Sequence, residues 1–205
     1  MILGIDTCGP SGTVALARLD DGEISVLAQT EMTGKTYTAQ LVPAVRAMLT
    51  EQRAEPAALQ AIVVVNGPGS FTGIRIGVSS AKGFAEALEI PLLAVSRLAV
   101  LAWKAGRQQA ALDAGRREFY FRHEDQEALL AAADVPNSGS LAVCEASAQQ
   151  AFPKAVLVDP PTASDALNFA APRILARDFD DVVTLDGNYL RRSDAEIFAK
   201  VAPKP

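Results

Sequence analysis

The 205-residue chain is poor in the residues that most often build catalytic and metal sites. It has one histidine, His123, and two cysteines, Cys8 and Cys144, which lie far apart and form no CxxC pair. One histidine excludes a two-histidine metal site and argues against a Ser-His-Asp triad. The polar neighbours of His123 favour a solvated strand end. The two cysteines favour free thiols in a reducing compartment.

Long hydrophobic runs and an excess of positive charge are also missing. The longest apolar stretches, such as 61–65 and 90–95, are far shorter than the roughly 20 residues that cross a bilayer. The first residues carry no basic segment and no cleavage signature. We therefore expect a cytoplasmic protein without membrane contact. The net charge is −5, so the chain is poorly suited to grip RNA unaided, and any RNA would be held by a more basic partner.

The composition that remains is that of a folded globular protein, with 49% hydrophobic and 21% charged residues. In residues 1–105, periodicity and turn signals predict the order βββαβαβα. The predicted strands are 2–6, 13–19, 23–29, 61–66 and 91–95. The predicted helices are 36–52, kinked or frayed by Pro43, then 74–88, and a third from a Ser96 cap to Trp103. This order favours a mixed sheet covered by helices.

Residues 106–205 read as a second unit after a polar boundary at 106–109. Strands are predicted at 110–113, 118–123, 141–144 and 156–158, and a helix at 165–177 that contains Pro172. The tail 188–205 is expected to fray. The segments ILGIDT (2–7) and ALDAG (111–115) both place an aspartate at the end of an apolar strand. This weak repeat suggests two related lobes with a cleft between them.

Two segments of the first lobe could carry chemistry. Asp6 and Thr7, at a strand end, could hold phosphate or hydrated magnesium, although a turn-capping aspartate is favoured on these residues alone. GPGSFTGIRIG (67–77) opens a helix, where backbone N–H groups suit an anion, but it lacks the Gly-Lys-Ser/Thr of a Walker loop. Gly73 and Gly77 allow close approach of another backbone, so a partner interface competes with a ligand site.

The third segment, DAGRREFY (113–120), has Arg116 and Arg117 where a phosphate-cradling turn would have glycines. The arginines could pair with an anion or form an ordinary charged hairpin. No serine, cysteine or lysine has an evident base. Asp6 and Asp113 are therefore the only carboxylates expected to face the cleft. If Asp6 only caps its turn, removing it should cost about 1 kcal/mol.

Together ILGIDT, GPGSFTGIRIG, DAGRREFY and NYLR (188–191) resemble the TsaB family, also called YeaZ, along nearly the whole chain. The resemblance implies an α/β protein with the two-lobed actin-like ATPase fold (sugar kinase, Hsp70 and actin; ribonuclease H-like) and duplicated mixed-sheet lobes. Lobe I would span 1–105. A shortened lobe II would span 106–205, with the C-terminal helix 162–178 packing back toward lobe I.

The resemblance also implies a role without catalysis. Such proteins are scaffold or activator subunits in the synthesis of threonylcarbamoyladenosine (t6A) on tRNA. They bind TsaD, are joined by the ATPase TsaE, reach tRNA only through the complex, and form a homodimer when alone. TsaD-like enzymes hold a metal through two histidines four apart on a helix, and residues 36–52 contain none. We expect no catalytic or metal-binding residue, and one surface shared by TsaD and the homodimer, formed by Tyr37, Leu41, Val45, Gly69, Ser70, Phe71, Thr72, Gly73, Arg75 and Gly77.

No cofactor is implied as required. ATP or ADP with magnesium remains an optional ligand at the partner junction, with a vestigial nucleotide site at Asp6, Thr7, Asp113 and Gly115. The chain departs from the family in having Tyr37-Thr38 where many members have His-Thr, and in its 113–118 hairpin. Two enzyme alternatives stay open: a nucleotide-dependent phosphotransferase relying on Asp6 and Asp113, and a glycoprotease-like peptidase.

Overall fold

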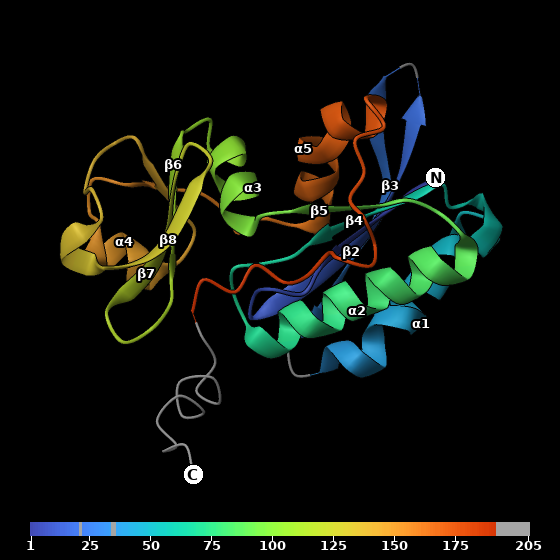
Figure 1. Ribbon diagram of the computed structural model, residues 1–205, viewed down its shortest axis with the longest axis horizontal. Helices are drawn as coiled ribbons and strands as arrows, with labels where there is room; N and C mark the ends of the chain where they lie inside the picture. Colours follow the sequence, from blue (N-terminus) through green and yellow to red (C-terminus); the bar gives the residue numbers. More distant parts are fainter. Residues whose placement is uncertain (21, 34–35, 192–205) are drawn as a thin grey trace, which may run out of the picture.

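The computed structural model describes residues 1–20, 22–33 and 36–191, which form two five-stranded sheets of the same topology (Figure 1). The first sheet has the order β3-β2-β1-β4-β5, and the second has the order β10-β9-β6-β7-β8. Strands β6 to β10 therefore take the places of β1 to β5. The predicted two-lobed α/β fold with duplicated mixed sheets is confirmed.

The first sheet is a meander followed by two parallel strands. Strands β1, β2 and β3 pair antiparallel, whereas β4 and β5 run parallel to β1. Strands β1 and β4 are buried along their whole length, as expected for continuous apolar runs in the centre of a covered sheet. The bounds are Ile2–Asp6 (β1), Ser11–Asp20 (β2), Glu23–Thr33 (β3), Ala61–Val65 (β4) and Leu92–Val95 (β5).

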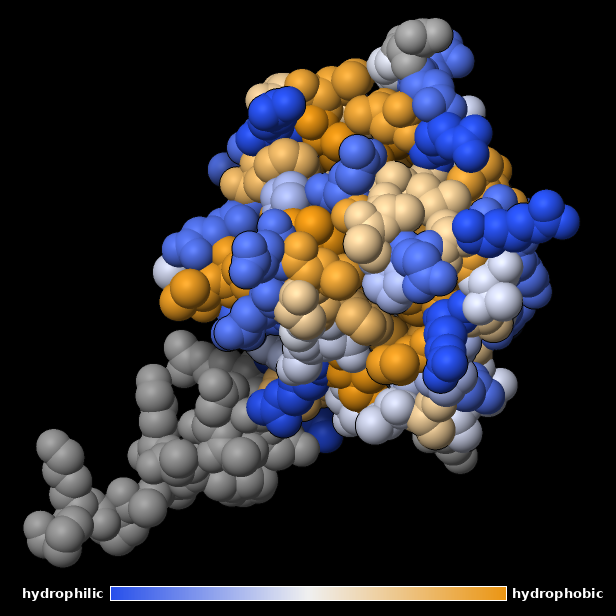
Figure 2. Space-filling model, turned by 90° about the vertical axis from the view of Figure 1, so that its right-hand side faces the viewer, coloured by the Kyte–Doolittle hydropathy of each residue, from blue (hydrophilic) through white to orange (hydrophobic). Residues whose placement is uncertain are grey.

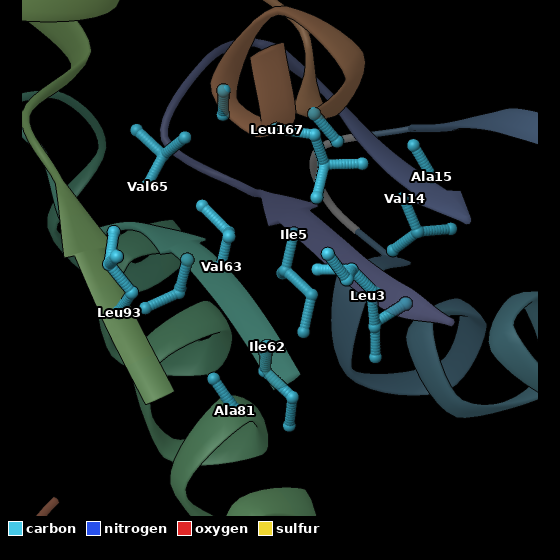
Figure 3. Packing of buried hydrophobic residues seen from close by; sticks show 14 of the residues in the cluster. Leu3, Ile5, Val14, Ala15, Ile62, Val63, Val65, Ala81, Leu93 and Leu167 are labelled. Carbon is cyan, nitrogen blue, oxygen red and sulfur yellow. The ribbon is translucent and has the colours of Figure 1, made fainter. Parts of the chain in front are cut away.

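Helices cover both faces of this sheet. Helices α1 (Tyr37–Glu51) and α2 (Phe71–Leu88) lie on one face, and α5 (Ala163–Leu175) lies on the other (Figure 1). Figure 3 shows the same sandwich in side chains, with Leu167 of α5 on one side of the strands and Ala81 of α2 on the other. Pro43 and Pro172 lie inside α1 and α5, and neither ends its helix.

Helix α2 begins earlier than its sequence predicts. The expected start was residue 74, but the helix begins at Phe71 because Ser70 caps it and accepts a hydrogen bond from the Gly73 N–H at 3.2 Å. Gly73 is thus a helical residue rather than part of a turn.

The helical segments inserted between the strands of the second sheet are shorter than those of the first. A three-residue 3-10 helix, η3 (Ala132–Asp134), stands where the first lobe has α1, and the six-residue α4 (Ala146–Ala151) stands where it has α2. This explains the shortened second lobe. Strand β8 and helix α4 were not predicted. The strands are Gln109–Asp113 (β6), Glu118–His123 (β7), Gln126–Ala131 (β8), Leu141–Val143 (β9) and Val156–Leu157 (β10).

The last helix of each lobe packs on the other lobe's sheet. Helix α3 (Arg97–Lys104) follows β5, but its Leu98 and Leu101 are buried with Leu112 of β6 in a core of the second sheet. Helix α5 follows β10 and returns to the first sheet, where Leu167 and Ile174 join the main core. Val100 of the same helix is buried in the main core of the first lobe, so α3 packs between the two sheets, and the lobe boundary at residue 105 stays a prediction.

None of the helices among the described residues is long and apolar enough to cross a bilayer. The short helix η2 (Pro56–Ala58) links α1 to β4.

Candidate functional site

A cleft of about 1110 Å³ opens where β1 and β6 end. The turn after β1 and the first turn of α2 line one side, including Gly9, Ser70 and Thr72. Asp113 and Glu145 line the other side. The cleft predicted between two related lobes is therefore present. Of the two aspartates expected to face it, Asp113 lines it, whereas Asp6 is buried and does not.

The two aspartates form the same local structure. Asp6 accepts a hydrogen bond at Oδ1 from the Cys8 N–H at 2.8 Å, and Asp113 accepts one at Oδ1 from the Gly115 N–H at 2.7 Å. Each carboxylate thus bonds to the backbone two residues further on and fixes the turn that follows its strand. The turn-capping interpretation is confirmed for Asp6 and holds for Asp113 as well.

Asp6 is also buried against a positive charge. It is 2% exposed, and its Oδ2 lies 3.8 Å from Nε of Arg97. Burial raises the pKa of Asp6 above its ordinary value, although Arg97 and the Cys8 N–H pull it back. Arg97 keeps its charge: burial would lower its pKa, but Asp6 and other nearby groups raise it above the ordinary value.

This geometry does not fit magnesium at Asp6. One carboxylate oxygen is used by the Cys8 N–H, and a cation near the other would lie beside a guanidinium. Thr7 is fully buried, and its Oγ1 donates to the Gly73 carbonyl at 2.7 Å. Of the four residues predicted for a nucleotide, Asp113 and Gly115 line the cleft, whereas Asp6 and Thr7 do not. The described residues contain no group of three or more His, Cys, Asp or Glu that could hold a metal.

Two charged residues at the cleft were missed from the sequence. Arg97 is the first residue of α3 and is 4% exposed. Glu145 accepts a hydrogen bond at Oε2 from the Asp113 N–H at 2.6 Å. Arg97 looks like an ordinary polar residue at a helix start, because nothing in the local pattern shows that the turn after β1 lies against it.

Replacing Glu145 by glutamine should stabilise the protein at neutral pH. Burial raises the pKa of this carboxyl above 4.5, its ordinary value, despite the Asp113 N–H and Arg97, which lower it. A raised folded-state pKa means that the carboxylate weakens the fold above that pKa and no longer does so below about pH 4.5. Glu145→Gln keeps an acceptor for the Asp113 N–H. We expect a higher melting temperature than wild type at about pH 7.5 and no difference near pH 4. A less stable variant at the higher pH would contradict this.

Five of the residues predicted for a partner interface are buried inside the first lobe. Tyr37, Leu41 and Val45 belong to its main core. The Tyr37 hydroxyl donates to the Gly9 carbonyl at 2.9 Å, and burial raises the Tyr37 pKa to about 12. The apolar stripe of α1 was recognised correctly, but it packs on the sheet of its own chain. Its assignment to a partner is wrong.

The spacing of Gly73 and Gly77 also serves the interior. A Cβ at Gly73 would overlap the Thr7 carbonyl oxygen, and one at Gly77 would overlap Thr7 Oγ1. The close neighbour that these glycines admit is therefore the end of β1, not a second protein. A bulky residue at Gly77 would act on the fold first.

The other predicted interface residues remain accessible at the start of α2. Ser70, Thr72 and Arg75 are exposed, and Gly69 and Phe71 are partly exposed. The Arg75 guanidinium lies 4.0 Å from the centroid of the Phe71 ring, which packs on Tyr189 at 4.8 Å.

A groove of about 780 Å³ on the outer side of α1 and α2 was not predicted. Val42 is 53% exposed beside it, although Leu41 next to it is buried. Figure 2 views the side at which α1, η2 and α2 end, and shows hydrophobic surface interleaved with hydrophilic residues. The groove is lined mainly by Val42, Arg46, Leu49, Pro56, Phe84 and Leu88.

The NYLR segment joins the two lobes. The Asn188 N–H donates to the Asn66 carbonyl at 2.7 Å, and Asn188 Nδ2 donates to Glu127 Oε2 at 2.6 Å. Glu127 of β8 also accepts from Ser96 Oγ and from Arg122. This motif thus fixes the lobes to each other. The rest of the predicted tail, 192–205, lies outside the described residues.

Comparison with known proteins gives consistent matches. The family model TsaD, described as tRNA N6-adenosine threonylcarbamoyltransferase, matches residues 25–166. An uncharacterized protein of Mycobacterium tuberculosis is 34% identical over 97% of this chain and 95% of its own length. The tRNA threonylcarbamoyladenosine biosynthesis protein TsaB of Escherichia coli is 36% identical over 58% of this chain and 53% of its own length.

Solved structures lead to the same family as the sequence matches. A crystal structure from Pseudomonas aeruginosa, described as an uncharacterized protein with similarity to peptidase YEAZ, superimposes with a TM-score of 0.78 at 28% identity. It covers 93% of this chain and 99% of its own. The family model, the relatives and this structure all agree with the four motifs, and the chain therefore belongs to the TsaB (YeaZ) family, whose named members are tRNA threonylcarbamoyladenosine biosynthesis proteins.

Proposed function

We propose that the protein is a non-catalytic subunit of the t6A-synthesising complex, which binds and activates TsaD. The observation that carries this proposal is the groove on α1 and α2, an exposed apolar surface on a chain of the TsaB family. TsaE would join the assembly, tRNA would be held by the complex as a whole, and the protein itself would need no cofactor. The setting would be the cytoplasm.

The chemistry of the buried groups supports a role without turnover. Asp6 would be a poor general base, because it is buried and paired with Arg97. Burial raises the pKa of Cys8 well above its ordinary value and that of Cys144 to about 12, so neither thiol is primed as a nucleophile. These features favour the scaffold over both enzyme alternatives, the phosphotransferase and the peptidase.

The groove has the composition of a docking surface. Its floor is apolar, with Leu49, Phe84 and Leu88, and its rim carries Arg46 and Arg53. An apolar centre with a charged rim is typical of protein interfaces. We propose that TsaD and a second copy of this chain compete for this face and the adjoining start of α2.

The variant Val42→Arg tests this surface. The side chain is exposed, so the fold should be unaffected, while a charge placed beside the apolar groove should weaken TsaD binding at least about tenfold. Binding is measured by calorimetry, and self-association by analytical ultracentrifugation. Leu157→Arg is the matched control, because Leu157 is 55% exposed but lies on β10 of the second lobe. Equal losses in the two variants would reject this docking face.

The proposed role itself is tested by threonylcarbamoyl transfer to tRNA. The protein alone should form no product, and adding it to TsaD should raise the TsaD rate. Turnover by the purified protein alone that disappears in Asp6→Ala would instead establish an enzyme.

A further inference from the structure

The Arg97 guanidinium is the least satisfied charged group in the described part of the chain. Its side chain is 5% exposed, and buried Nε has no hydrogen-bond partner. Asp6 is the only acidic group within ion-pair distance among the described residues, and the 3.8 Å separation is too long for a hydrogen bond. A guanidinium has five N–H donors, and leaving them unpaired inside a protein is costly.

Arg97 lines the interlobe cleft together with groups that also favour negative charge. The cleft wall includes Ser70 and Thr72 from the first turn of α2. Since α2 has 18 residues, the free N–H groups of that turn carry the partial positive charge of a full helix. The Ser70 hydroxyl already accepts from Gly73 but can still donate.

The opposite wall limits what can bind. Asp113 and Glu145 are carboxylates on the second lobe, so the cleft is not uniformly positive. An occupant must place an anionic group at Arg97 and turn neutral or hydrogen-bond-donating groups toward the second lobe. The cleft volume of about 1110 Å³ is ample for a small organic molecule of this kind.

We propose that Arg97 forms a metal-independent subsite for an oxyanion, the phosphate or carboxylate group of a small ligand held in the interlobe cleft. The guanidinium takes the place that a bound cation would need beside Asp6, so the anion pairs with the protein directly. Charge-assisted hydrogen bonds from arginine to such groups are among the strongest in proteins. Arg97 itself lies outside the proposed TsaD docking face, which shares only the start of α2 with this cleft.

The test uses inorganic phosphate, citrate and AMP as probes, each titrated into the purified protein in metal-free Tris buffer. Calorimetry and thermal shift should show saturable binding of at least one probe in the range below about 10 mM. Arg97→Gln should weaken that binding at least about tenfold, and Arg97→Lys should restore part of it. Arg177→Gln, which removes the same charge from an exposed residue in the turn after α5, should leave the affinity unchanged.

Two further measurements keep the proposal falsifiable. The single variant Arg97→Gln leaves Asp6 without its ion-pair partner and could destabilise the fold. The double variant Asp6→Asn/Arg97→Gln removes both buried charges, so a loss of binding in it cannot be attributed to an unpaired charge. Addition of magnesium should not improve binding. Absence of binding by all three probes, equal binding by Arg97→Gln, or a requirement for magnesium would each overturn the subsite. TsaD binding by Arg97→Gln should be normal, which separates failure here from failure of the proposed function.

Discussion

Replacing Gly73 by alanine is expected to lower the free energy of unfolding by on the order of 3 kcal/mol or more. The added Cβ would overlap the Thr7 carbonyl oxygen, and this oxygen belongs to backbone that follows a fully buried strand. The strand cannot retreat, because α5 packs against its other face. Separating α2 from the strand end would also break the bond from Thr7 Oγ1 to the Gly73 carbonyl. Urea denaturation followed by circular dichroism measures the loss.

Gly83 provides the control in the same helix. A Cβ at Gly83 meets nothing within 4 Å, so Gly83→Ala should stabilise the protein by up to about 1 kcal/mol through helix propensity. If the two alanine variants had similar stability, the close contact between α2 and the end of β1 would be refuted.

Asp6→Ala should have the second large effect, a loss of about 3–5 kcal/mol. The turn-capping role alone accounts for about 1 kcal/mol. The larger value follows from Arg97, which would be left charged and buried with no other acidic group within ion-pair distance among the described residues. Chemical denaturation at neutral pH is the measurement.

The duplicated fold supplies an internal control for this prediction. Asp113 makes the same turn bond as Asp6, but no arginine lies within ion-pair distance of it among the described residues. Asp113→Ala should therefore cost only about 1 kcal/mol. The double variant Asp6→Ala/Arg97→Met should recover much of the loss of the single one. Similar costs for the two aspartates would contradict the role given to Arg97.

Local pattern sufficed to predict most of the fold. Strands β1 and β4 are apolar runs that end at turn signals, and the buried face of α1 follows helical spacing. Strand β8 was missed because QEALLA lacks β-branched and aromatic residues, and pairing with β7 makes it a strand. Helix α4 is too short for a clear periodic signal.

Sequence reasoning could predict only those parts of the site whose contacts join residues close together in the chain. Asp6 and Asp113 were found because each ends an apolar strand just before a turn of small residues, and in the structure each carboxylate bonds to the backbone two residues further on. Arg97 and Glu127 act on groups that are distant in sequence, and no local pattern indicates such partners. Burial of Tyr37 against the turn after β1 likewise depends on tertiary packing. From the sequence alone, the apolar face of α1 could therefore belong either to the interior of the protein or to a partner interface.

The exchange of α3 and α5 between the two sheets has a consequence for synthesis on the ribosome. The five strands of the first sheet are complete once residue 95 has been made, but the helix that covers one face in the described part of the chain is α5, which ends at Leu175. Through that interval the nascent chain must carry an uncovered apolar sheet, and such surface is prone to aggregate. The sheet of the first lobe is thus covered on both faces only after most of the second lobe has been synthesised. The two lobes therefore complete their folding together.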